Sequence, residues 1–181
     1  MPDLTSYHQV RGLPVRLTNT RPDIDSGQVV DRLGQALDLI ATHAPRRFNR
    51  LRHDIQAFVV RRFPCRGAFF PETRECLVEL TFTVNPRHTL AEIAASIVHE
   101  ATHARIARIC GPLPDHLRPR EERLCRKAEV EFGLALPDGR SVVERAQSAL
   151  QLADRDVAPV VDWVEGARRV AASDQETGDK L

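Results

Sequence analysis

Two histidines and a glutamate stand close together in the run SIVHEATHARI, residues 96–106. His99, Glu100 and His103 form the pattern H-E-x-x-H. On an α-helix, residues four apart lie on one face a turn apart, so both imidazoles can point at one ion while Glu100 lies beside them. Neutral imidazole is a good ligand for Zn²⁺, which in catalytic sites keeps a position for water. The pattern therefore predicts that His99 and His103 bind Zn²⁺.

Glu100 has a separate role in this hypothesis. Zinc lowers the pKa of a bound water, and a neighbouring carboxylate can take its proton and pass it to a leaving amine. The opposing interpretation is a helix whose histidines make local hydrogen bonds or face solvent. We favour the metal site, because these three side chains would be costly to bury without a metal or partners. Close packing around them is indicated by four alanines: Ala94, Ala95, Ala101 and Ala104.

Capping signals place the motif within one long helix. Thr89 stands three residues before Glu92, which is the capping-box pattern, and Gly111 followed by proline supplies a stop. We expect a helix over about residues 90–110, with the motif near its middle. A second helix is predicted from Pro119 through residue 132, because proline is favoured in the first turn of a helix.

Residues 90–132 resemble the zincin metallopeptidases, whose shared signature is H-E-x-x-H on an active-site helix. The longer signature with a third histidine is absent, because Ile106 and Ile109 stand where its glycine and histidine would be. The acidic segment REERLCRKAEVEF is instead similar to the gluzincin type, in which a glutamate from a second helix completes the site. The resemblance implies a zinc-dependent peptidase that hydrolyses peptide bonds in a peptide or protein substrate.

The third ligand has two candidates. Glu122 lies three residues before Cys125, which resembles the gluzincin pattern of a glutamate followed one turn later by a small residue. Helical phase places Glu121 nearer the centre of the apolar face and Glu122 nearer its edge. We favour Glu122, because a ligand that reaches a cleft belongs at the edge of a buried stripe. Glu121 stays open as the alternative.

Several other residues receive weaker interpretations. Glu129 shares the face of Glu122 and is a candidate to orient a ligand histidine, but a solvated surface charge is the favoured interpretation. Cys110 and Cys125 are interpreted as packing thiols rather than ligands. His88 and His116 are candidates to assist an oxyanion, and neither is assigned.

The rest of the chain predicts an α+β fold, with a small antiparallel or mixed sheet packed on the active-site helix and a helical C-terminal half. LPVRLTN reads as an extended segment, and residues 27–43 form an amphipathic helix with Ser26 as its N-cap. Strands are expected in DIQAFVVRRF and in CRGAFFPETRECLVELTFTVNP, where alternation continues through Val84. Residues 67–70 either form an edge strand that pairs with substrate backbone or belong to a plain core hairpin. RSVVERAQSALQLADRD and APVVDWVEGARRVAAS complete the helical half.

Length and composition indicate one ordinary globular domain. The chain has 181 residues, of which 42% are hydrophobic and 28% charged. We expect a single domain over residues 1–172 and a disordered tail over residues 173–181. The four cysteines form no CxxC pair and are expected to be free thiols in a reducing cytosol.

Charge and hydropathy bear on the partners. Of the 26 basic residues only Lys127 and Lys180 are lysines, yet the formal net charge is +1, so nucleic-acid binding is not expected. No secretory signal or apolar run of about 20 residues is present, so we expect a cytoplasmic protein without membrane contact. The alternative function is a regulatory or partner-binding protein on a zincin-like fold. The sequence specifies neither the substrate nor the oligomeric state.

Overall fold

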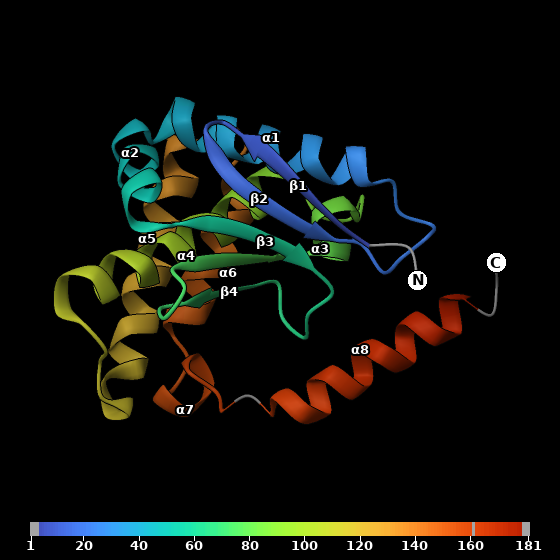
Figure 1. Cartoon of the computed structure of the whole chain (residues 1–181). Helices are drawn as coiled ribbons and strands as arrows, with labels where there is room; N and C mark the ends of the chain where they lie inside the picture. Colours follow the sequence, from blue (N-terminus) through green and yellow to red (C-terminus); the bar gives the residue numbers. More distant parts are fainter. Residues whose placement is uncertain (1–3, 161, 179–181) are drawn as a thin grey trace.

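The computed structural model describes residues 4–160 and 162–178 and contains one mixed five-stranded sheet (Figure 1). In sheet order the strands are β1 (Thr5–Val10), β2 (Leu13–Thr18), β3 (Ala57–Arg61), β5 (Glu75–Glu79) and β4 (Gly67–Phe70). Strands β2, β3 and β5 run parallel, whereas β1 and β4 are antiparallel to their neighbours and form the two edges. The predicted α+β class with a small mixed sheet is confirmed.

Two helices precede β3. The N-cap of helix α1 (Ser26–His43) is Asp25. Its carboxylate accepts a hydrogen bond from the backbone N–H of Gln28. The prediction of Ser26 as the N-cap is therefore wrong by one residue. Helix α2 (Pro45–Asp54) was not predicted: its first residue, Pro45, signals both the end of α1 and the start of α2.

The predicted strand through Val84 ends early. The chain turns into helix α3 (Leu80–Val84) at Glu79, whose carboxylate accepts a hydrogen bond from the backbone N–H of Phe82. The hydroxyl of Thr83 donates to the backbone carbonyl of Glu79. Alternation of residue types continues beyond Glu79, but these local hydrogen bonds favour a helical turn.

Helix α4 (Leu90–Cys110) contains the H-E-x-x-H motif and confirms the predicted helix. Both bonds of the capping box between Thr89 and Glu92 are present, and Gly111 ends the helix with φ +70°. Helix α4 packs against β4 and β5 on one side and against α1 on another. Fully buried side chains between the sheet and these two helices form the core: Leu17, Leu33, Leu37, Ile40, Phe58, Ile93 and Ile97.

The C-terminal half is helical, as predicted. After a 3₁₀ turn (Asp115–Leu117) come α5 (Arg118–Ala135), α6 (Arg140–Leu150), α7 (Asp154–Val157) and α8 (Trp163–Gly178). The segment predicted as one helix over residues 140–156 is thus divided between α6 and α7. Helix α8 includes residues 173–178, which were expected in a disordered tail, and residues 179–181 lie outside the described part of the chain.

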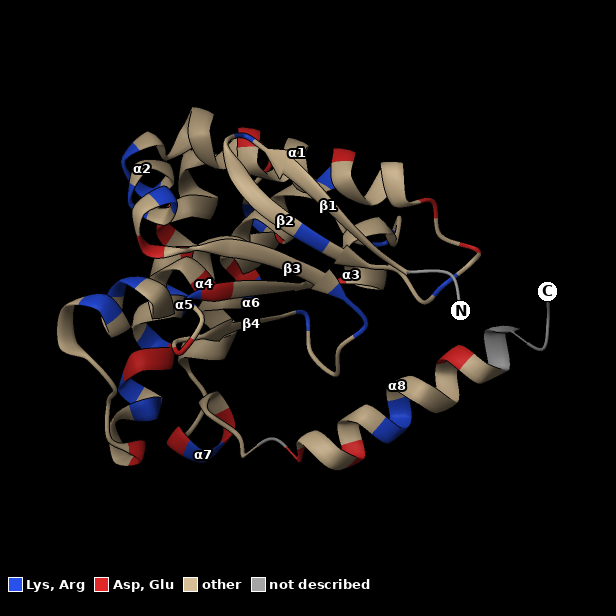
Figure 2. Cartoon of the chain, in the orientation of Figure 1, with Lys and Arg blue, Asp and Glu red and all other residues tan. Residues whose placement is uncertain are grey.

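Charged residues of both signs are distributed over the molecule (Figure 2). The densest group of basic residues lies on α2, which contains four arginines. Within the described residues, no helix combines the length and the apolar character needed to cross a membrane. A cytoplasmic location and the lack of nucleic-acid binding stay predictions of the sequence.

The contact between α5 and α6 depends on two glycines. A Cβ added to Gly139 would lie 1.9 Å from the carbonyl oxygen of Gly133, so the two backbones touch where α6 begins. Because the obstacle is backbone, it cannot rotate away. The close approach fixes how α6 lies against α5.

We therefore expect Gly139→Ala to lower the free energy of unfolding by about 2–3 kcal/mol, as overpacking does. Urea unfolding of the two proteins measures this difference. Gly34→Ala in α1 is the matched control, because its Cβ would meet Val10 at an ordinary 3.5 Å. The control should be neutral or stabilising by up to about 1 kcal/mol. Equal stability of Gly139→Ala and the natural protein would contradict the close-contact account.

Candidate metal centre

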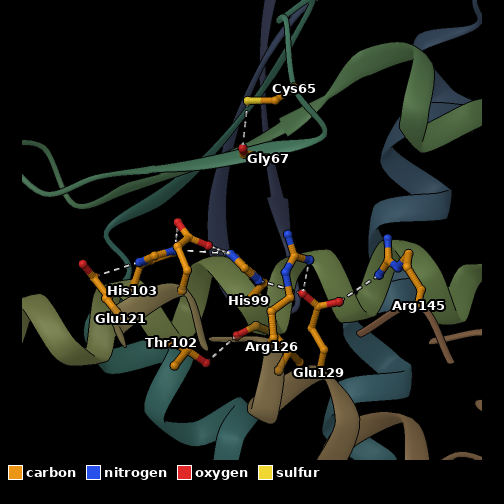
Figure 3. Close-up of polar contacts among 11 residues, drawn as sticks. Cys65, Gly67, His99, Thr102, His103, Glu121, Arg126, Glu129 and Arg145 are labelled. Carbon is orange, nitrogen blue, oxygen red and sulfur yellow. Dashed lines mark hydrogen bonds and ion pairs between the residues drawn. The ribbon is translucent and has the colours of Figure 1, made fainter. Parts of the chain in front are cut away.

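The two histidines of the motif point at the same position. Their Nε2 atoms lie 3.2 Å apart, and both side chains come from α4, one turn apart (Figure 3). Two nitrogens on a tetrahedral zinc, with bonds of 2.0–2.1 Å, lie about 3.3–3.4 Å apart. The separation of His99 and His103 therefore fits a shared metal ion.

Glu122 brings a carboxylate to the same position from α5. Its Oε2 lies 3.2 Å from Nε2 of His99, and its Oε1 lies 3.5 Å from Nε2 of His103. Burial raises the pKa of this carboxyl, but the hydrogen bonds with His103 and His99 outweigh that effect and hold the pKa well below its usual range. The side chain is therefore an anion and offers an oxygen ligand without losing a proton.

Glu121, the alternative third ligand, occupies a different position. Its Oε1 lies 2.8 Å from Nδ1 of His103, the ring nitrogen that faces away from Glu122. A carboxylate there accepts the Nδ1 proton and fixes the orientation of the ring. Adjacent glutamates on α5 thus contact opposite nitrogens of one imidazole.

Glu129 holds the other histidine in the same way. Its Oε1 lies 2.7 Å from Nδ1 of His99, and the residue is 1% exposed. The favoured interpretation of Glu129 as a solvated surface charge is therefore wrong. Burial raises its pKa, but His99, Arg126 and Arg145 outweigh burial and lower it. The seven-residue spacing from Glu122 correctly indicated a shared face, but burial depends on arginines that the spacing did not identify.

These contacts leave three electron-pair donors facing one another. Because each Nδ1–H is directed at its own carboxylate, each neutral ring keeps its lone pair on Nε2. Two such lone pairs and the anionic Glu122 then converge, which requires either a cation or additional protons. Burial lowers the pKa of His99, but Glu122 and Glu129 outweigh it and the pKa is raised. Burial also lowers the pKa of His103, which contacts with Cys125, Glu121 and Glu122 raise well above the usual value.

Cys125 provides a second possible donor. A ligand atom of each of His99, His103 and Cys125 lies within 4.8 Å of the others. The thiol is buried, and burial raises its pKa to about 11 although His103 lowers it. Glu122 is already ionised, whereas Cys125 must first lose a proton, so the carboxylate is the better third ligand.

Glu100 lies against strand β4. A Cβ on Gly67 would be 3.1 Å from Cγ and from Oε1 of Glu100 and 3.2 Å from Oγ of Ser96, so the lack of a side chain at residue 67 leaves room for the carboxylate. Burial raises the pKa of Glu100, while His99 and His103 lower it, and the net shift is upward. No residue in the described part of the chain donates a hydrogen bond to this carboxylate.

The candidate site opens into a cleft of about 810 Å³. One wall is the β4 edge of the sheet, and α4 and α5 contribute the histidines and the glutamates. The remaining walls come from α6 and from the stretch between the end of α7 and the start of α8. Lining residues from the β4 side and from that stretch are Gly67, Ala68, Phe69, Val157, Ala158, Pro159 and Trp163.

Other candidates from the sequence lie elsewhere. His88 packs on Phe82 with ring centroids 4.8 Å apart, near the start of α4, and His116 lies in the exposed 3₁₀ turn. Cys110 is exposed at the end of α4. None of these three residues lines the cleft. Residues 67–70 do form an edge strand, one of the two interpretations given to them, but nothing in the sequence indicated that Gly67 makes room for Glu100.

Comparison of the chain with protein-family models, with curated protein sequences and with solved structures found no match.

Replacing Glu129 tests the support of His99. Glu129→Gln removes the charge that keeps the imidazole basic, so we expect zinc affinity to fall by about 10–100-fold. Competition with a chromophoric chelator measures this change. Glu131→Gln on the same helix is the control, because Glu131 is exposed and pairs only with Arg47 in the described structure. Equal affinities for the two variants would show that Glu129 does not tune the site.

The pKa directions predict proton release. Because the folded pKa values of His99 and His103 are raised, both rings hold their Nε2 protons to a higher pH than an ordinary histidine does, and zinc must displace these protons. At about pH 6, below the ordinary pKa of histidine, we expect about one to two protons released per zinc. The number should fall as pH rises through the raised pKa values, and Glu122 contributes none. Calorimetry in buffers of different ionisation enthalpy measures this release, and no release at about pH 6 would contradict the assignment.

Proposed function

We propose that the protein is a zinc-dependent peptidase of gluzincin type, in which His99, His103 and Glu122 hold Zn²⁺ and Glu100 is the general base. The observation that carries the proposal is the convergence of the two Nε2 atoms and the Glu122 carboxylate, with each Nδ1 held by a further carboxylate. When bound, zinc supplies a Lewis acid that lowers the pKa of water and polarises a carbonyl.

Glu100 suits the transfer of a proton. It is adjacent to His99 in sequence, and its carboxylate faces the β4 side of the cleft, where a substrate carbonyl would lie. The pKa of Glu100 is raised toward neutral pH, which helps the carboxylate to accept a proton and then return it to the leaving amine.

Strand β4 supports a peptide as the substrate. It is the last strand of the sheet and pairs with β5 on one side only, while Gly67–Phe69 line the cleft. An extended peptide can add its backbone to such an edge and so run past the metal site. The absence of a side chain at Gly67 allows close approach.

The position of Cys125 near the two histidines supports an alternative function, in which zinc is structural. If its thiolate joined the two histidines and Glu122, the site would have four protein ligands and no position for water. Such a closed site stabilises a fold and does not hydrolyse peptides. The protein would then be a regulatory or partner-binding protein that uses zinc structurally.

The test combines metal content with hydrolysis. Purified protein is expected to contain about one zinc per chain and to cleave members of a mixed peptide library. Glu100→Gln should keep the zinc and lose hydrolysis by about 10²–10⁴-fold, because the general base is removed. Glu144→Gln, at an exposed position on α6, is the control and should retain both.

The remaining outcomes separate the hypotheses. Stoichiometric zinc without cleavage of any library peptide would favour the closed structural site. Protein that binds no zinc, even after exposure to it, would contradict both hypotheses.

A further inference from the structure

The end of the cleft beside His99 is rich in arginine. Arg126 from α5, Arg145 from α6 and Arg66 from the loop before β4 all line this cleft. Figure 3 shows the guanidinium groups of Arg126 and Arg145 flanking Glu129, with Arg126 next to His99. Three long cationic side chains from three separate elements therefore meet at one end of the candidate active site.

Ion pairs within the described structure balance only part of their charge. Glu129 is the carboxylate that Arg126 and Arg145 share, at 2.6 Å and 2.9 Å, and it also accepts the proton of His99. Arg66 forms no ion pair with any described residue, and its guanidinium lies 5.1 Å from the centre of the Phe82 ring. Among the described residues, Glu129 is thus the one carboxylate that forms ion pairs with any of these three guanidinium groups, whereas Glu92 acts on Arg66 and Glu100 on Arg126 only at longer range.

Two of these arginines, Arg126 and Arg145, also have an N–H donor without a hydrogen-bond partner in the described structure. Arg126 and Arg145 each give one terminal nitrogen to Glu129, and the Nε atom of each is buried without a partner in the described structure. Burial lowers the pKa of Arg66, and the like charge of Arg145 lowers it further. Neutralising the buried Glu129 requires one arginine, so that role alone does not account for all three.

The opposite end of the cleft differs. There Glu121 and Asp115 accompany Arg118, so acidic and basic groups are both present. The excess of positive charge is confined to the His99 end. A substrate that crosses the cleft meets different charge on the two sides of the metal site.

We propose that Arg66, Arg126 and Arg145 form a subsite for a carboxylate of the substrate, so that the enzyme cleaves next to an acidic residue or near a free C-terminus. This inference rests on the proposed peptidase function. Guanidinium groups recognise carboxylates through paired N–H donors. The Glu129 carboxylate and the His99 imidazole lie between Arg126 or Arg145 and the metal position. One to three residues of extended peptide, at about 3.3 Å each, would cover this distance.

A binding experiment tests the subsite without requiring turnover. The probes are the monohydroxamates of succinate, glutarate and adipate, which bind zinc at one end and present a carboxylate at the other. Each is compared by calorimetry with its half-amide, in which the carboxylate is replaced by a neutral amide. For zinc-loaded protein we expect at least one chain length at which the acid binds on the order of tenfold more tightly than the amide.

Substitutions assign the preference to the arginines. Arg66→Gln should reduce the ratio of acid to amide affinity to less than about threefold, with little change for the amides. Arg145→Gln should reduce the same ratio, although its contact with Glu129 means that the affinity for the amides can change as well. Arg66 is the safer position, because it is exposed and unpaired among the described residues, so its substitution leaves Glu129 and the fold intact. Arg140→Gln on α6 is the matched control and should keep the full ratio, because Arg140 is exposed and bonds to Glu144.

The outcomes are distinguishable. Equal binding of acids and amides by zinc-loaded protein would overturn the subsite and leave the peptidase proposal standing. No binding of any hydroxamate, or no zinc, would overturn the proposed function and the subsite with it. If the preference is found, cleavage of peptides that carry glutamine for glutamate, or a C-terminal amide for the acid, identifies which carboxylate the arginines bind.

Discussion

Each imidazole of the H-E-x-x-H helix is held from behind by a carboxylate of α5. Glu129 contacts His99 and Glu121 contacts His103, both at the Nδ1 atom. These two contacts decide which nitrogen carries the proton and direct both Nε2 lone pairs at Glu122. They also require α5 to lie along α4 in one register. Any shift between the two helices would therefore change both their packing and the geometry of the site.

The surrounding fold maintains that register. Helix α6 lies on α5 through the backbone contact of Gly133 and Gly139 and brings Arg145 to Glu129. On the other side, β4 approaches α4 at Gly67 and forms the wall of the cleft beside Glu100. A buried carboxylate such as Glu129 is stable only with these partners, because an uncompensated buried charge is strongly unfavourable. The site is therefore assembled from elements that are distant in sequence.

Locally determined features could be predicted from the sequence. The limits of α4 follow from Thr89, Glu92 and Gly111, which act within one turn of the helix ends. The H-E-x-x-H motif is likewise recognisable from the spacing of His99, Glu100 and His103 alone. Features that depend on distant partners could not be predicted: the strand pattern after Glu79 gives way to a helical turn that Glu79 caps while it pairs with Arg62. Likewise, helical phase placed Glu129 on the correct face, but only the fold shows the arginines that allow its burial.

The central claim is that two imidazoles and the Glu122 carboxylate form an open metal site. X-ray absorption at the zinc edge of the zinc-loaded protein tests it most directly, because it reports the type and distance of the ligand atoms. The account predicts a first shell of nitrogen and oxygen only, at about 2.0–2.2 Å. A sulfur ligand at about 2.3 Å would assign Cys125 to the metal and contradict the open site.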